Sequence, residues 1–187
     1  MSAFPTLYTE RLLLRELVAS DAPALFSIYR DAEAMQWFGV DPMTDLLQAQ
    51  ALIETFAQWR TQANPGTRWG LECDGQLLGT CGFFKWNRGW SSCSLACELA
   101  PKARGRGLMG EALRAMLDWG FAKMKLHRVE ALVHPQNLAS LALLGRLGFG
   151  KEGTLREAGF WAGQRQDLHI LALLAHDYPT ASKVISG

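Results

Sequence analysis

The sequence lacks any long hydrophobic run. No stretch approaches the roughly 18 consecutive apolar residues that a membrane-spanning helix requires. The first ten residues also lack the basic segment followed by an apolar one that marks a secretory leader. These absences predict a cytoplasmic protein with no membrane partner.

Excess charge is lacking too, since 19 Lys and Arg residues offset 18 Asp and Glu residues and leave a formal net charge of +1. Such a chain has no general attraction to phosphate backbones, so we expect no nucleic-acid partner. The four cysteines, Cys73, Cys81, Cys93 and Cys97, form no C-x-x-C pair and have no histidine cluster nearby. Because zinc sites usually show close ligand pairs, we expect reduced core thiols and no metal.

What the sequence does have is an ordinary globular composition over 187 residues, with 49% hydrophobic and 20% charged residues. This length suits one domain with its own core. No linker, repeat or low-complexity segment divides the chain. We therefore predict a single α+β domain over residues 1–187.

Hydrophobic periodicity and turn residues predict the elements of this domain. A first helix begins near Pro23 and passes through Tyr29, and further helices are expected over about 45–61, 108–124 and 138–147. Asn64-Pro65-Gly66 ends the second of these helices. Strands are expected over about 7–17, 68–73, 76–84, 90–99, 128–133, 149–155 and 166–174. Asp74-Gly75 and Asn87-Arg88-Gly89 mark tight turns, so the strands on either side of them should be antiparallel neighbours.

The most informative segment is a glycine-rich loop between a predicted strand and a predicted helix. Gly105, Gly107 and Gly110 allow the backbone to turn sharply and to approach a ligand closely. The helix directs unpaired N–H groups and its positive dipole end into the loop, and Arg104 and Arg106 add full charges. A tight turn with solvated arginines is the structural alternative, but the number and spacing of these features favour a diphosphate or polyphosphate site.

The same spacing satisfies the dinucleotide fingerprint G-x-G-x-x-G, and Glu130 follows Gly110 by 20 residues as a candidate ribose ligand. A nicotinamide-dependent oxidoreductase is therefore an alternative function. Against it, the loop lies in the second half of the chain and the strands before it are predicted hairpins. A P-loop is excluded because no Gly-Lys-Ser/Thr sequence follows.

The loop resembles the acetyl-coenzyme A (acetyl-CoA) signature of the GNAT superfamily of N-acetyltransferases. That signature, Gln/Arg-x-x-Gly-x-Gly/Ala, reads Lys-Ala-Arg-Gly-Arg-Gly at 102–107, with lysine in place of Gln or Arg. Three further segments are similar to the branch that acetylates ribosomal-protein N-termini: 10–22, 134–153 and 163–169. The order and spacing of these motifs extend the resemblance over roughly residues 9–175.

The resemblance implies a mixed, mostly antiparallel, twisted sheet of six to seven strands, splayed between strands 4 and 5 and flanked by about four helices. Acetyl-CoA, as the acetyl donor, would lie in that opening. Backbone groups at Glu98 and Leu99 would pair with the pantetheine arm, and the loop amides would hold the diphosphate. The implied cofactor-binding residues are Leu99, Arg104, Gly105, Arg106, Gly107, Met109, Gly110 and Asn137.

The implied reaction is direct attack of a neutral amine on the thioester in a ternary complex. A base that takes the ammonium proton and an acid that protonates the leaving thiolate both assist it. Glu98 is the predicted base, because the superfamily often has a carboxylate at this strand end, and Ser140 is the predicted acid. Many family members have a tyrosine where this chain has Leu144, which makes Ser140 the substitute. Lesser candidates for the base are Glu157, His134 and Asp167.

The acceptor is left open: a protein N-terminus or a small amine, bound by a monomer or a homodimer. By family analogy, its specificity should reside in residues 22–61 and in the loops near Asn87 and Phe160. Tryptophans at turns or element ends either line an acceptor groove or serve ordinary packing. They are Trp37, Trp86, Trp90 and Trp161. A non-catalytic acyl-CoA-binding module on the same fold is a further alternative.

Overall fold

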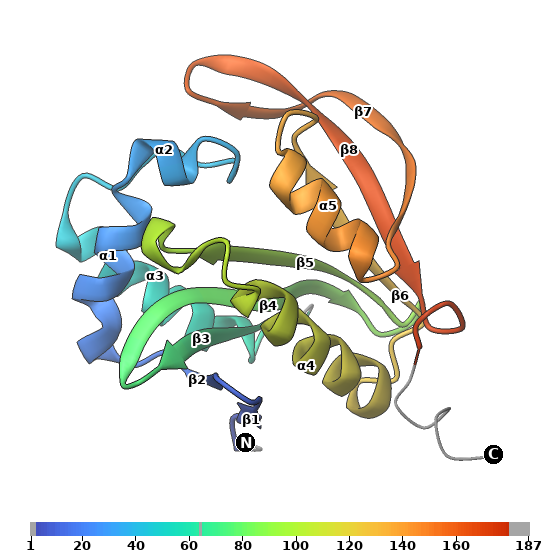
Figure 1. Cartoon of the computed structure of the whole chain (residues 1–187), viewed down its shortest axis with the longest axis horizontal. Helices are drawn as coiled ribbons and strands as arrows, with labels where there is room; N and C mark the ends of the chain where they lie inside the picture. Colours follow the sequence, from blue (N-terminus) through green and yellow to red (C-terminus); the bar gives the residue numbers. More distant parts are fainter. Residues whose placement is uncertain (1–2, 64, 180–187) are drawn as a thin grey trace.

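A single twisted sheet organises the chain in the computed structural model, which describes residues 3–63 and 65–179 (Figure 1). In this part of the chain the eight strands are β1 (Leu7–Tyr8), β2 (Leu13–Glu16), β3 (Thr67–Cys73), β4 (Gln76–Asn87), β5 (Ser92–Leu99), β6 (Arg128–Val133), β7 (Gly150–Trp161) and β8 (Gln164–Leu174). The α-helices are α1 (Ala22–Tyr29), α2 (Ala32–Met35), α3 (Leu46–Trp59), α4 (Leu108–Lys123) and α5 (Leu138–Arg146). Asn64 of the predicted turn and both predicted domain limits lie outside the described residues.

The strand order is β1-β2-β3-β4-β5-β6-β8-β7, and β5–β6 is the parallel pair in an otherwise antiparallel sheet. β4 and β5 pair along most of their length, from Gly79 opposite Leu99 to Asn87 opposite Ser92. β5 and β6 pair only where Ser92–Ser94 meets Arg128–Glu130, and the strands then diverge. The predicted mixed sheet and its opening are confirmed, with β5 and β6 as the predicted fourth and fifth strands.

The strand count differs from the prediction at the N-terminal end. The predicted strand over 7–17 is two strands, because the Thr9 N–H donates to the Leu12 carbonyl at 2.9 Å and the Leu12 N–H donates to Thr9 Oγ1 at 2.9 Å. This turn reverses the chain, so β1 pairs antiparallel with β2. The sheet therefore has eight strands among the described residues rather than six to seven.

The β7–β8 hairpin is longer than predicted, and it rises from the sheet as a curved arm (Figure 1). Most β7 residues are exposed on both faces, so the strand has no alternation of buried and exposed side chains beyond the predicted segment 149–155. A strand without a buried face shows little hydrophobic alternation in its sequence, which explains why the predicted strand is shorter than β7.

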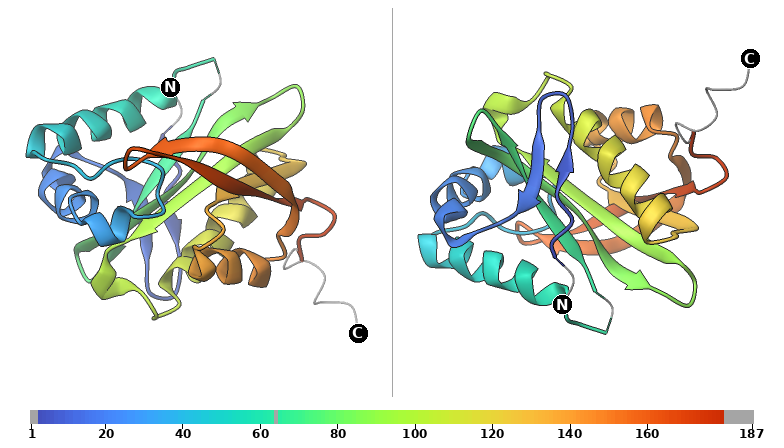
Figure 2. Two further views of the ribbon diagram at one scale, coloured as in Figure 1. Left: turned by 90° about the horizontal axis from the view of Figure 1, so that it is seen from above. Right: turned by 90° about the horizontal axis from the view of Figure 1, so that it is seen from below.

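Two hydrophobic cores lie on the two faces of the sheet. The larger core packs Trp69, Phe83 and their neighbours against α4 and α5, and the smaller one is built by α1 and α3, with Leu25 and Phe56 at its centre. Figure 2 shows these helices on their respective faces. Each fully buried side chain of this size contributes about 1.5–3 kcal/mol, which fixes the strands that frame the opening. No helix of the described residues is long and apolar enough to cross a membrane.

Candidate active site

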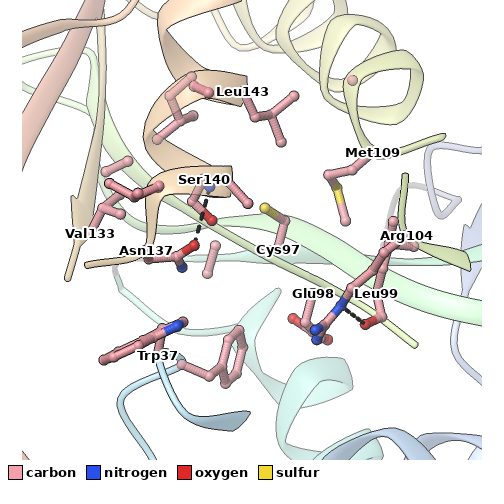
Figure 3. Close-up of a pocket in the computed structure, with 18 of the residues that line it drawn as sticks. Trp37, Cys97, Glu98, Leu99, Arg104, Met109, Val133, Asn137, Ser140 and Leu143 are labelled. Atoms are coloured by element: carbon pink, nitrogen blue, oxygen red, sulfur yellow. Dashed lines mark hydrogen bonds between the residues drawn. The ribbon is translucent and has the colours of Figure 1, made fainter. Parts of the chain in front are cut away.

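A cavity of about 890 Å³ lies where β5 and β6 diverge (Figure 3). Its walls come from β5, from the loop before α4 and the first turn of α4, from the end of β6, from α5, and from residues in and after α2. All residues predicted for the site line this cleft except Arg106. Segments far apart in the sequence thus meet around one space.

The glycine-rich loop has the backbone that its sequence predicts. Gly105 and Gly107 have φ values of +73° and +77°, in the left-handed region that favours glycine. Gly107 is the N-cap of α4 and no side chain caps this helix, so the N–H groups of its first turn can bind an anion. A Cβ at Gly110 would lie 3.5 Å from Leu143 Cδ1, so the missing side chain keeps the space between α4 and α5 open.

A clamp holds this loop from outside the cleft. Glu111 in the first turn of α4 accepts hydrogen bonds from Thr9 Oγ1 at 2.5 Å and from the Arg11 backbone N–H at 2.8 Å. The Arg11 guanidinium pairs with Glu111 at 2.6 Å and donates to the Arg106 carbonyl at 2.9 Å. Burial raises the pKa of Glu111, but the bonds from Thr9 and Arg11 outweigh it, and the net pKa is lowered. The clamp fixes the loop while the Arg106 side chain stays out of the cleft wall.

Two arginines do line the cleft near the loop. Arg104 donates from Nε to the Leu99 carbonyl at 3.3 Å, which places its guanidinium over the end of β5 (Figure 3). Arg146, in the last turn of α5, also lines the cleft, and its guanidinium has no hydrogen bond or ion pair with any residue that the structure describes. The sequence analysis did not predict Arg146 as a cleft residue. The sequence feature that could have indicated it is its position three residues after Leu143, on the same side of the helix.

Asn137 and Ser140 lie together at the start of α5. The Ser140 N–H donates to Asn137 Oδ1 at 3.1 Å, so Asn137 caps the helix. The Ser140 hydroxyl makes no hydrogen bond within the described part of the chain, and its side chain faces Cys97 across the cleft (Figure 3). Burial raises the pKa of Cys97 to about 12, so its thiol is neutral. Leu144 is buried beside them and has no proton to offer.

Glu98 lies in the cleft wall, but its carboxylate is fully engaged. Oε2 pairs with the Arg68 guanidinium, and Oε1 accepts from Thr80 Oγ1 and, at 2.8 Å, from the Tyr29 hydroxyl. Arg68 also donates to Thr80 Oγ1 at 2.6 Å and to the Ala96 carbonyl at 2.9 Å. The network joins β3, β4, β5 and α1 beneath the opening.

The charge of this network is balanced internally. Burial lowers the pKa of Arg68, but the negative charge of Glu98 outweighs it, so the net pKa is raised and Arg68 stays charged. Burial and the same carboxylate raise the pKa of Tyr29 well above its usual value, so its hydroxyl remains a donor. Sequence analysis missed these partners, although strand alternation puts Arg68, Thr80 and Glu98 on one face of neighbouring strands.

An aromatic group borders the other end of the cleft. The Trp37 indole stacks on the His134 imidazole with ring centroids 4.4 Å apart, and Trp161 packs edge-on against the same imidazole at 6.0 Å. The Trp161 Nε1–H donates to the Gln36 carbonyl at 3.0 Å, which joins the β7–β8 hairpin to the segment after α2. His134 therefore supports the cleft from behind Trp37.

The other lesser candidates are not brought to the cleft. The Glu157 backbone N–H donates to Asp167 Oδ1 at 2.8 Å across the β7–β8 hairpin, and neither residue lines the cavity.

Comparison with known proteins places this arrangement in a family. Residues 11–150 match the family model described as acetyltransferase (GNAT) domain. The chain belongs to the GNAT acetyltransferase family. It is 34% identical over 175 residues to the uncharacterized N-acetyltransferase p20 of Bacillus licheniformis, an alignment that covers 92% of this chain and 98% of the relative.

Two further comparisons agree with the family. The ribosomal protein uS5-alanine N-acetyltransferase of Escherichia coli is 35% identical over 104 residues, covering 55% of this chain and 54% of that enzyme. The crystal structure of spermidine N-acetyltransferase from Vibrio cholerae in complex with CoA and spermine has the same fold, with a TM-score of 0.78 at 23% identity, covering 90% and 98% of the two chains. The predicted resemblance is confirmed, and the protein is an N-acetyltransferase of this family.

The GNAT sheet also removes the basis of the oxidoreductase alternative. A doubly wound dinucleotide fold needs successive parallel β-α units. Here the loop follows an antiparallel meander, and β5–β6 is the parallel pair among the described strands. The G-x-G-x-x-G spacing therefore belongs to the GNAT loop, and the predicted ribose role of Glu130 is not supported.

Proposed function

We propose that this GNAT protein transfers the acetyl group of acetyl-CoA to a primary amine by direct attack in a ternary complex. The observation that carries the proposal is the single cleft that joins the loop 104–110 to Ser140 and Glu98. A phosphate-binding end and a proton-donating end in one space suit a long thioester with charged phosphates at its far end.

The residues present fit such a donor. The cleft volume of about 890 Å³ lies in the range of about 300–1,000 Å³ that is usual for ligand sites. Main-chain N–H groups of Gly105–Gly110 would bind the diphosphate at the start of α4, with Arg104 and Arg146 supplying full charges. The backbone of β5 from Leu95 to Leu99 has no partner on β6, although the Ala96 and Leu99 carbonyls accept from Arg68 and Arg104. The remaining groups on this edge would pair with the amides of the pantetheine arm.

When bound, acetyl-CoA supplies a thioester carbonyl that a neutral amine can attack. We propose that Ser140 Oγ donates a proton to the leaving sulfur, since its hydroxyl points into the cleft and has no described partner. Ser140 then regains a proton, directly or through water, from the attacking nitrogen, which loses its second proton as the amide forms. Glu98 is the proposed base, and it would receive the ammonium proton at Oε1, directly or through water. Because Oε1 already accepts from Tyr29 and Thr80, that step requires one of these bonds to lengthen.

The acceptor is an amine whose class the cleft constrains only in part. Among the relatives, one is named for spermidine and one for an alanine of ribosomal protein uS5. A small amine and a protein N-terminus therefore both stand as acceptors in this proposal.

Calorimetry with purified protein tests the donor, and thiol release tests the reaction. We expect heat from CoA and acetyl-CoA, stabilisation of the fold by CoA but not by NAD(H), and thiol release that requires an amine. Absence of heat from both CoA compounds would remove the proposal. Binding without thiol release across amines and peptides would favour the non-catalytic acyl-CoA-binding module.

A further inference from the structure

Of the two carboxylates that line the cleft within the described residues, only Glu98 is compensated by a cation. Glu33 of α2 is exposed, and no hydrogen bond or ion pair joins its carboxylate to another described residue. The arginines Arg104 and Arg146 line the same cleft near the loop that begins α4. The cleft thus has an uncompensated negative charge on the α2 side and positive charges on the loop side.

Trp37 follows Glu33 by four residues in the chain, and both line the cleft. Figure 3 shows the Trp37 indole at the cleft wall. His134 stacks on one face of the indole with planes 20° apart. A tryptophan ring carries negative potential on its faces and attracts a cation within about 6 Å of its centroid. The ring and the carboxylate together have the composition of a site for an alkylammonium or guanidinium group.

Two hydrogen bonds orient the imidazole behind Trp37. The Gln136 backbone N–H donates to His134 Nδ1 at 3.1 Å, and Nε2 lies 3.2 Å from Gln166 Oε1. With Nδ1 as an acceptor, Nε2 is the ring nitrogen that donates to Gln166. The ring is thus held against one face of the indole, while Trp37 still lines the cleft.

Hydrogen bonds from the β7–β8 hairpin hold the segment that carries Trp37. The Trp161 Nε1–H bonds the Gln36 carbonyl at 3.0 Å, and the Ala162 N–H bonds Asp41 Oδ1 at 3.0 Å. Both bonds connect the tip of the β7–β8 hairpin to the segment that carries Trp37. A recognition surface held in place in this way loses little conformational entropy when a ligand binds.

We propose that Glu33 and Trp37 form a subsite for a second positive charge on the acceptor, separate from the amine that is acetylated. This inference rests on the proposed function. The reacting amine has to be neutral when it attacks, so its own charge cannot be the feature that the enzyme retains. The acceptor class is therefore dicationic: a diamine, or a peptide N-terminus followed by a basic side chain.

Matched acceptor pairs test the subsite. We would compare kcat/KM for 1,5-diaminopentane with pentylamine, and for Ala-Lys with Ala-norleucine, at saturating acetyl-CoA. In each pair the second charge is removed while the chain length is nearly kept. We expect the wild type to prefer the dicationic member of at least one pair by about tenfold or more, and Glu33→Gln and Trp37→Leu each to reduce that preference by about tenfold.

Glu54→Gln is the matched control, because Glu54 is an exposed carboxylate on α3 that does not line the cleft. This control should keep the wild-type preference, and all three variants should bind CoA as the wild type does in calorimetry. Three outcomes would overturn the subsite while CoA binding stands. The first is equal kcat/KM within both pairs, and the second is turnover of neither dicationic acceptor. The third is a preference that survives in both Glu33→Gln and Trp37→Leu. Loss of CoA binding in the wild type would instead overturn the proposed function.

Discussion

Replacing Glu98 with Gln separates the two roles that the structure allows this residue. Glu98 is 7% exposed and its partner Arg68 is 4% exposed, so the pair is shielded from water. The substitution leaves the Arg68 charge buried without its counterion. Breaking a buried pair from one side costs about 3–5 kcal/mol. At about 2–4 °C per kcal/mol for a domain of this size, we expect the melting temperature to fall by about 6–20 °C.

A second substitution restores the fold without restoring the base. Arg68→Met together with Glu98→Gln removes both charges, and the new amide oxygen at position 98 can still accept from Tyr29 and Thr80. Replacement of a buried pair by uncharged groups of similar volume is often neutral. We therefore expect the double variant to recover at least half of the lost melting temperature.

Activity in the double variant decides the role of Glu98. If Glu98 accepts the proton of the acceptor amine, kcat should stay about 10²–10⁴-fold below the wild type although stability and CoA affinity have recovered. Melting curves, CoA calorimetry and thiol release at saturating substrates measure the three quantities. Recovery of kcat along with stability would refute the base assignment and leave Glu98 as the counterion that holds β3, β4 and β5 together.

Three further predictions concern the donor side. Arg146→Gln should weaken CoA binding about tenfold because it removes one of the two charges proposed for the phosphates, and an unchanged affinity in calorimetry would remove Arg146 from that site. Gly107→Ala should raise the dissociation constant for CoA because φ at this position is +77°. Gly145→Ala is the control and should bind CoA normally, because Gly145 is helical and an added methyl group would meet no atom within 4 Å. Glu111 has a lowered pKa, so its stabilisation is complete above the ordinary value of 4.5 and is lost as pH falls through the folded value. Urea melts should therefore show a steeper loss of stability with acid below this pH in the wild type than in Glu111→Gln.

Elements with strong local patterns were predictable from the sequence. β6 has the predicted bounds because His134-Pro135 ends it, and α4 matches within one residue because its apolar face repeats over four turns. α2 was missed because four residues are too few to show a helical period. The first turn of α1 illustrates another limit. Asp21 is the N-cap residue of this helix, but its carboxylate caps no N–H group there because it pairs with Arg15 at 2.7 Å.

The candidate site divides in the same way. Gly105 and Gly107 were predictable because glycines spaced before a helix are a local pattern, whereas Asn137 and Ser140 were predicted only through the family resemblance. The Arg68–Glu98 pair joins residues 30 positions apart on strands whose register no local pattern specifies. Sequence therefore identified Glu98 as a cleft residue but did not show that its lone pairs were already occupied.

The hydrogen bond from Trp161 to Gln36 spans 125 positions in the chain, whereas Arg104–Gly110 is one contiguous loop. The subsite proposed for the acceptor thus depends on two segments far apart in the chain, whereas the loop proposed for the diphosphate is one segment. On this proposal, substitutions at the hairpin tip alter which amines are accepted while the loop is unchanged. Related transferases would then diverge in target without rebuilding their chemistry.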